Sequence, residues 1–158
     1  MIRIVEADAP ARIEVARCLF RDYAAGEPDG LCFADFGAEV AGLPGAYAPP
    51  AGRLLLALEG EAAAGCVGLA PGRVAGEAEM RRLYVVPGER GKGVGRALAD
   101  AALAAARAAC YRAVALETRE HMAAARALYQ RLGFADRGRD GTVLAMRLVL
   151  AAITETSP

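Results

Sequence analysis

The sequence predicts one α+β domain, in which helices flank a mixed, mostly antiparallel sheet. Three observations support this fold class. The chain has 158 residues, which is an ordinary length for a single domain. Short apolar or alternating segments of strand length recur along it, separated by turns rich in glycine and proline. One long alanine-rich helical segment separates two strand candidates, so that these two strands are expected to pair in parallel.

The first half is expected to contain a strand, a helix, a loop and a hairpin. Ile2–Glu6 alternates and predicts a strand, and Asp8 is a candidate cap for the helix that follows. Residues 26–52 hold six glycines and four prolines, which predicts a loop with one short helix over Phe33–Leu43. Two apolar runs around a glycine turn predict a hairpin: Arg53–Glu59, Gly60-Glu61 and Ala64–Ala70.

The second half alternates strands and helices. Glu77–Val86 is a strand candidate, and the alanine-rich segment Val94–Cys110 has high helix propensity. Arg112–Glu117 predicts the next strand. The last expected elements are a helix over Ala123–Leu132 ended by Gly133, strands over Phe134–Arg137 and Thr142–Leu150 joined at Asp140-Gly141, and a frayed tail over 151–158. The expected domain is therefore residues 1–150.

Composition and charge exclude several classes of protein. The formal net charge is zero, which argues against a dedicated nucleic-acid binder. No apolar segment is long enough to cross a membrane, and the charged N-terminus does not match a signal peptide, so a cytoplasmic location is expected. Residues 1–79 carry 12 acids and 6 bases, whereas residues 80–158 carry 7 acids and 13 bases. This asymmetry predicts either two charged ligands or charge pairing within the chain.

Four widely spaced cysteines and one histidine, His121, do not form a metal-binding pattern. No metal site is expected. The cysteines are interpreted as free and mostly buried thiols.

The most informative segment is a strand that runs into a glycine-rich turn and then into the long helix. Glycines at a helix start leave backbone N–H groups open to an anion, and three cations stand among them. The sequence therefore predicts a phosphate cradle here. The residues of this cradle are Arg90, Gly91, Lys92, Gly93, Val94, Gly95 and Arg96. The nucleotide-binding glycine patterns fail: Val94-Gly95 stands where a Walker loop needs Lys-Ser/Thr, and Arg96 where the dinucleotide pattern needs glycine.

Two motifs together resemble the GNAT superfamily of N-acetyltransferases. The first is Arg-x-x-Gly-x-Gly, met by Arg90, Gly93 and Gly95 directly after the strand. The second is the segment Ala125-Arg126-Ala127-Leu128-Tyr129-Gln130-Arg131-Leu132-Gly133-Phe134. The resemblance implies a splayed parallel strand pair at a cleft for CoA. It also implies transfer of an acetyl group from acetyl-CoA to a primary amine by direct attack in a ternary complex.

The resemblance also implies roles for individual residues. Backbone groups of Leu83, Tyr84 and Val85 would bind the pantetheine arm, and those of residues 90–96 the diphosphate. Tyr129 matches the family's tyrosine and is the candidate acid, with a packing role as its alternative. Glu79 is the candidate base, with an ion pair to Arg81 as its alternative.

The acceptor is less well defined by the sequence. Phe33, Phe36 and Tyr47, together with Tyr23 and Glu39, could hold a cationic amine, or could form a satellite core under the loop. Met122 stands where many relatives carry asparagine, which leaves the positioning of the acceptor open. A non-catalytic acyl-CoA sensor and an unrelated phosphate-binding module remain alternatives. Relatives often form dimers, but no feature of this sequence decides the oligomeric state.

Overall fold

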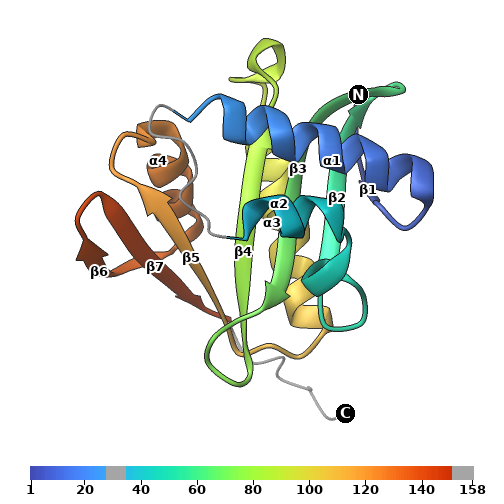
Figure 1. The fold of residues 1–158 in the computed structure, drawn as a ribbon. Helices are drawn as coiled ribbons and strands as arrows, with labels where there is room; N and C mark the ends of the chain where they lie inside the picture. Colours follow the sequence, from blue (N-terminus) through green and yellow to red (C-terminus); the bar gives the residue numbers. More distant parts are fainter. Residues whose placement is uncertain (28–34, 151–158) are drawn as a thin grey trace, which may run out of the picture.

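The computed structural model describes residues 1–27 and 35–150, which form one sheet between layers of helices (Figure 1). Within this part of the chain the sheet has seven strands in the order β1-β2-β3-β4-β5-β7-β6. The elements are β1 (Ile2–Glu6), α1 (Pro10–Ala25), α2 (Phe36–Ala41), a 3-10 turn (Gly45–Tyr47), β2 (Arg53–Glu59), β3 (Ala62–Pro71), β4 (Glu77–Val85), a 3-10 turn (Pro87–Glu89), α3 (Val94–Ala108), β5 (Ala113–Arg119), α4 (Ala123–Leu132), β6 (Ala135–Asp140) and β7 (Val143–Val149).

The expected fold class is confirmed. All neighbouring strands pair antiparallel except β4 and β5, which are parallel and joined through α3. The start of α1 differs from the prediction: Ala9 is the cap residue and Pro10 opens the helix, because proline at this position needs no N–H partner. The short helix is α2, which begins at Phe36, while residues 28–34 lie outside the described part.

Two hydrophobic cores lie on opposite faces of the sheet. One joins the sheet to α3 and includes Leu98, Leu103 and Met80. The other joins it to α1 and α2 and includes Phe20 and Tyr47. Burial on both faces makes the central strands β3 and β4 a rigid support for groups placed at their ends.

Acidic side chains of the first half of the chain form ion pairs with arginines of the second half. Glu39 binds Arg82, Glu77 binds Arg147, and Glu79 binds Arg81. The interpretation as charge pairing within the chain is therefore supported.

The cysteines depart from the expectation of mostly buried thiols. Among the described residues Cys66 is buried, whereas Cys18 and Cys110 are exposed. Cys32 lies outside the described residues. No described helix has both the length and the apolar character needed to cross a membrane, and no described cluster of side chains could hold a metal ion.

Candidate active site

The parallel strands β4 and β5 separate after a short paired section. Only Glu77, Ala78 and Glu79 of β4 face partners on β5, namely residues 113–115. Both strands then continue, and Figure 1 shows them diverging beyond this point. The divergence leaves the inner edges of both strands without a neighbouring strand, and buried backbone groups need partners.

A bulge in β4 turns the strand as it enters this opening. Tyr84 lies opposite Cys66 and Arg81 opposite Gly68, so β4 has one residue more than β3 between these pairs. Arg82 adopts a left-handed conformation with φ of 59°. Its guanidinium binds Glu39 of α2 through two hydrogen bonds of 2.8 and 2.9 Å, and its carbonyl accepts one from the Cys66 thiol at 3.4 Å. These contacts hold a conformation that costs energy in a non-glycine residue.

The bulge changes which side chains share a face. Regular alternation would place Leu83 and Val85 on the same face as Glu79. Instead Leu83 and Val85 pack into the core under α3, while Arg81 and Arg82 both lie on the side of α1 and α2. The extra residue shifts the alternation by one position, which corrects the expectation from the sequence.

The backbone of Val85 faces the opening. The N–H of Val86 donates to Ala64 of β3 at 2.9 Å, so the polar groups of Val85, and by alternation those of Leu83, point away from β3. The Val85 carbonyl accepts a hydrogen bond of 3.0 Å from Arg90. The groups predicted to contact the pantetheine arm therefore lie at the inner edge of β4.

The glycine-rich turn presents the start of α3. Gly91 and Gly93 have φ of 80° and 82°, a conformation that glycine adopts without strain. The first helical hydrogen bond joins the Ala97 N–H to the Gly93 carbonyl at 3.1 Å, so Val94, Gly95 and Arg96 keep N–H groups without a helical acceptor.

The charge at this helix start is positive. The first turn contains no acid, and Arg90, Lys92 and Arg96 are exposed around it. Cations at a positive helix end repel the dipole, whereas an anion there would be stabilised. The segment therefore has the charge and the donors of an anion site.

Tyr129 lies inside the molecule, on the inner face of α4. Its side chain belongs to the core under α3, and its ring centroid lies 5.8 Å from that of Phe134. Burial, and then the nearby Tyr23 phenol, raise the pKa of Tyr129 well above 10. The phenol is therefore protonated at neutral pH, as a proton donor must be.

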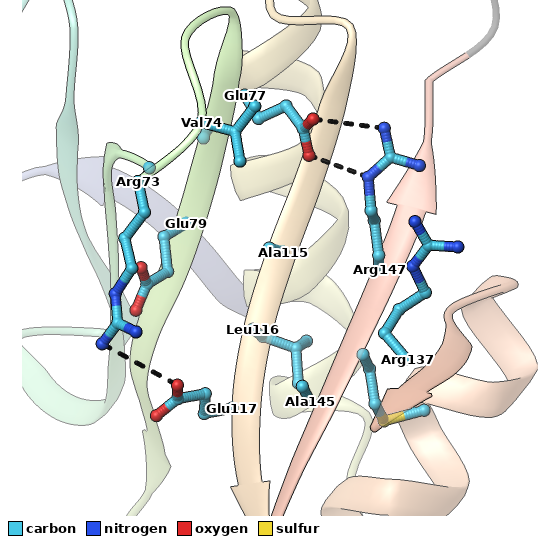
Figure 2. Close-up of a pocket in the computed structure, with 13 residues that line it drawn as sticks. Arg73, Val74, Glu77, Glu79, Ala115, Leu116, Glu117, Arg137, Ala145 and Arg147 are labelled. Carbon is cyan, nitrogen blue, oxygen red and sulfur yellow. Dashed lines mark hydrogen bonds and ion pairs between the residues drawn. The ribbon is translucent and has the colours of Figure 1, made fainter. Parts of the chain in front are cut away.

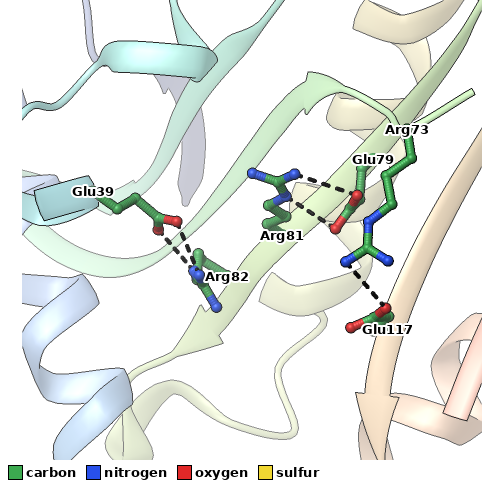
Figure 3. A network of polar contacts seen from close by, with 6 residues as sticks. All are labelled: Glu39, Arg73, Glu79, Arg81, Arg82 and Glu117. Carbon is green, nitrogen blue, oxygen red and sulfur yellow. Dashed lines mark hydrogen bonds and ion pairs between the residues drawn. The ribbon is translucent and has the colours of Figure 1, made fainter. Parts of the chain in front are cut away.

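Two neighbouring cavities open on the sheet face opposite α3. The larger, of about 440 Å³, lies between α1, α2, β4 and β5, and the smaller, of about 320 Å³, lies over β4, β5 and β7. Arg73, Glu79 and Glu117 line both (Figures 2 and 3). These three residues form the shared wall, which lies where β4 and β5 begin to separate.

Residues 12–134 match the acetyltransferase (GNAT) family. The chain belongs to the GNAT family. Acetyl-CoA is the co-substrate of this family.

Individual relatives agree with this family assignment. An IAA acetyltransferase of Azospirillum brasilense is 39% identical over 94 residues, which span 60% of this chain and 61% of that protein. A GNAT acetyltransferase from Staphylococcus aureus Mu50 has a TM-score of 0.82 at 17% identity, covering 96% of this chain and all of that one. The protein yncA of Salmonella typhimurium, solved with its cofactor acetyl-CoA, has a TM-score of 0.78 at 20% identity, covering 99% of this chain and 97% of that one. At these identities the two structures show a shared fold.

The two carboxylates of the shared wall differ in how they are held. Glu79 accepts two hydrogen bonds from Arg81, at 3.0 and 3.3 Å, and its side chain is 17% exposed. Glu117 of β5 is half exposed, and among the described residues only Arg73 forms an ion pair with it, at 3.9 Å (Figure 3). The sequence predicts Glu79, and not Glu117, as the base. Glu117 could have been found from the alternation of β5, which places it on the face of Ala115 and opposite to Leu116.

The residues predicted to bind the acceptor do not all lie at the same site in the structure. Phe36 lines the larger cavity beside Tyr23 and Glu39, and the Arg82 guanidinium lies 5.2 Å from the centre of its ring. Tyr47 is 1% exposed, packs against Phe20 and lines neither cavity. Phe33 lies outside the described residues. Phe36 is thus the member of this set that the fold places at a cavity.

Met122 and His121 lie between β5 and α4. The Met122 sulfur accepts a hydrogen bond from Thr118 at 3.6 Å, and Met122 lines the larger cavity. His121 approaches Glu27, near the end of α1, at 3.2 Å. A thioether here cannot donate the hydrogen bonds of the asparagine that many relatives carry.

Proposed function

We propose that this GNAT chain is an N-acetyltransferase that transfers the acetyl group of acetyl-CoA to a primary amine by direct attack. One observation carries the proposal: the inner edge of β4, which has no neighbouring strand after Glu79, and the N–H groups at the start of α3 without a helical acceptor open onto the same splay between β4 and β5. An extended amide-containing arm ending in a diphosphate fits such a site, since the strand edge binds amides and the helix start binds phosphate.

Residues of β4 and of the turn before α3 are placed to bind acetyl-CoA. Leu83 and Val85 would pair with the pantetheine arm, with Tyr84 between them, and the amides from Gly91 to Arg96 would hold the diphosphate. A Cβ at Gly95 would make ordinary van der Waals contacts with Val85 and Leu128, each at 3.6 Å. When bound, acetyl-CoA supplies an activated acyl carbon.

The reaction requires one base, one oxyanion donor and one acid. The amine must lose a proton before its lone pair bonds to the acyl carbon, and either Glu79 or Glu117 can accept that proton through water. The Leu83 N–H is the proposed donor to the oxyanion that forms. As the carbon–sulfur bond breaks, the Tyr129 hydroxyl gives its proton to the sulfur, and the second proton, which the nitrogen loses as the amide forms, restores the phenol.

The proposal is tested by measuring acetyl-CoA binding with calorimetry and CoA thiol release with a panel of primary amines. Amine-dependent thiol release, with an acetylated amine detected by mass spectrometry, supports it. Binding without turnover across a broad panel would favour the acyl-CoA sensor instead. Binding of ATP or NAD but not of acetyl-CoA would favour a different phosphate-binding module.

A further inference from the structure

The smaller cavity has a floor of small side chains and walls of charged ones. Ala115 of β5 and Ala145 of β7 form the floor, and no helix contributes to its lining (Figure 2). Side chains this short leave the space above neighbouring strands open. Because Glu79 and Glu117 line this cavity as well as the larger one, a molecule bound here lies next to the proposed transfer point.

At the end of this cavity away from Glu117, two lining arginines, Arg137 and Arg147, meet one lining carboxylate, Glu77. Glu77 accepts hydrogen bonds of 2.8 and 3.3 Å from Arg147, and Arg112 lies 3.6 Å from it. Arg137 is the third arginine beside this one carboxylate, and together these groups lower the pKa of Glu77, the Arg147 hydrogen bonds most strongly. Arg112 does not line the cavity, so the lining at this end has two positive charges against one negative charge, an excess suited to an anion.

Arg137 has no hydrogen bond or ion pair with any residue in the described part of the chain, although it lines the cavity next to Arg147 (Figure 2). The other two carboxylates of the lining are already matched, Glu79 by Arg81 and Glu117 by Arg73. The lining of the cavity therefore contains one guanidinium that forms no ion pair with another described residue.

Arg137 lies on the cavity side of β6, at a bulge. Asp136 lies opposite Met146 and Gly138 opposite Ala145, so Arg137 is the extra residue on β6. Met146 faces the core under α3, and Ala145 faces the cavity. Asp136 shares the face of Met146, so Arg137, the next residue of β6, lies on the face of Ala145, over the cavity floor.

We infer that this cavity binds a carboxylate of the acceptor through Arg137 and Arg147, so that the acceptor is a small amino acid whose amine lies at Glu79 and Glu117. This inference rests on the proposed function. A guanidinium has five N–H donors, and Arg147 uses two of its five on Glu77, so both arginines have donors left for a carboxylate. A volume of about 320 Å³ suits a single amino acid.

The experiment compares acceptors that differ only in the carboxylate. Thiol release is measured with the twenty common amino acids, and for each accepted one also with its amide and its decarboxylated amine. We expect Arg137→Gln to lower kcat/KM for the amino acid about tenfold, through KM, while the amide and the decarboxylated amine change less than twofold. Arg139→Gln is the matched control, since it removes the same charge from the same strand and Arg139 pairs with Glu120 instead.

Three results would overturn the inference: no amino acid is accepted while acetyl-CoA binds, Arg137→Gln weakens all three acceptor types equally, or Arg139→Gln has the same effect as Arg137→Gln. Acetylation of amines that lack a carboxylate, without any use of amino acids, would overturn the inference and leave the proposed function standing. Failure to bind acetyl-CoA at all would instead remove the proposed function.

Discussion

Replacing Gly93 with aspartate should weaken acetyl-CoA binding while leaving the fold intact. Gly93 is the cap residue of α3, and a Cβ placed on it would have no heavy atom within 4 Å. Its φ of 82° is the remaining constraint, and asparagine and aspartate tolerate this left-handed region better than other side chains. Gly93→Asn is therefore the matched control, since it carries the same backbone strain and nearly the same shape without the charge.

The magnitude follows from Coulomb's law. Two unit charges 4 Å apart interact by about 1 kcal/mol in water and about 4 kcal/mol at an effective dielectric constant of 20. The turn is exposed, so the lower part of this range applies. We expect the aspartate to weaken acetyl-CoA binding by about 2 kcal/mol relative to asparagine, which is about 30-fold. The difference in acetyl-CoA affinity between the two variants should become smaller as ionic strength rises.

The aspartate should lower the affinity for acetyl-CoA but raise the stability of the protein without ligand, relative to asparagine. An acid at a helix start is favourable by about 0.3–1 kcal/mol, so Gly93→Asp should unfold at a slightly higher temperature than Gly93→Asn. Calorimetric titration with acetyl-CoA measures binding, and a thermal scan without ligand measures stability. Equal affinities for the two variants would refute the placement of the diphosphate at the start of α3.

Three further predictions concern buried or charged side chains. Tyr129→Phe should lower kcat about tenfold or more with little change in KM, and full activity in steady-state assays would assign the tyrosine to packing. Glu79→Gln and Glu117→Gln, compared by their pH–rate profiles, should identify the base as the carboxylate whose loss removes the rise in rate with pH. Burial raises the pKa of Tyr47 to about 12, so the folded state holds its proton above pH 10 while the unfolded state loses it. Stability should therefore fall by about 1.4 kcal/mol per pH unit between about pH 10 and pH 12. Tyr47→Phe should show a shallower fall in urea unfolding, and an unchanged slope would contradict this explanation.

Much of the fold was predictable because its signals are local. Alternation marked the strands, alanine content marked α3, and glycine ended α4 at a residue with φ of 99°. The two motifs of the GNAT family lie within continuous segments, so the residues proposed to bind acetyl-CoA could be named from the sequence.

The acceptor side was less predictable because its contacts join residues distant in the chain. Glu77 and Arg147 are 70 positions apart, and Glu39 and Arg82 are 43 apart. Tyr47 resembled a pocket residue by composition, yet it fills the space over Gly68, where a Cβ would lie only 2.5 Å from its ring. Such a close fit depends on how the turn after α2 meets β3, and this is not encoded in the neighbours of Tyr47.

The sequence by itself determined the glycine-rich turn that is proposed to bind an anion, because backbone N–H groups at a helix start and glycines with positive φ depend on a few adjacent residues. Only the tertiary structure decided which side chains meet over the sheet. The bulges at Arg82 and Arg137 each shift a strand by one residue, and a shift of one residue moves every later side chain to the other face. The bulge in β4 arises from pairing with β3 and places Arg82 on the side of the larger cavity. The bulge in β6 arises from pairing with β7 and turns Arg139, which follows Arg137, off the face of Ala145.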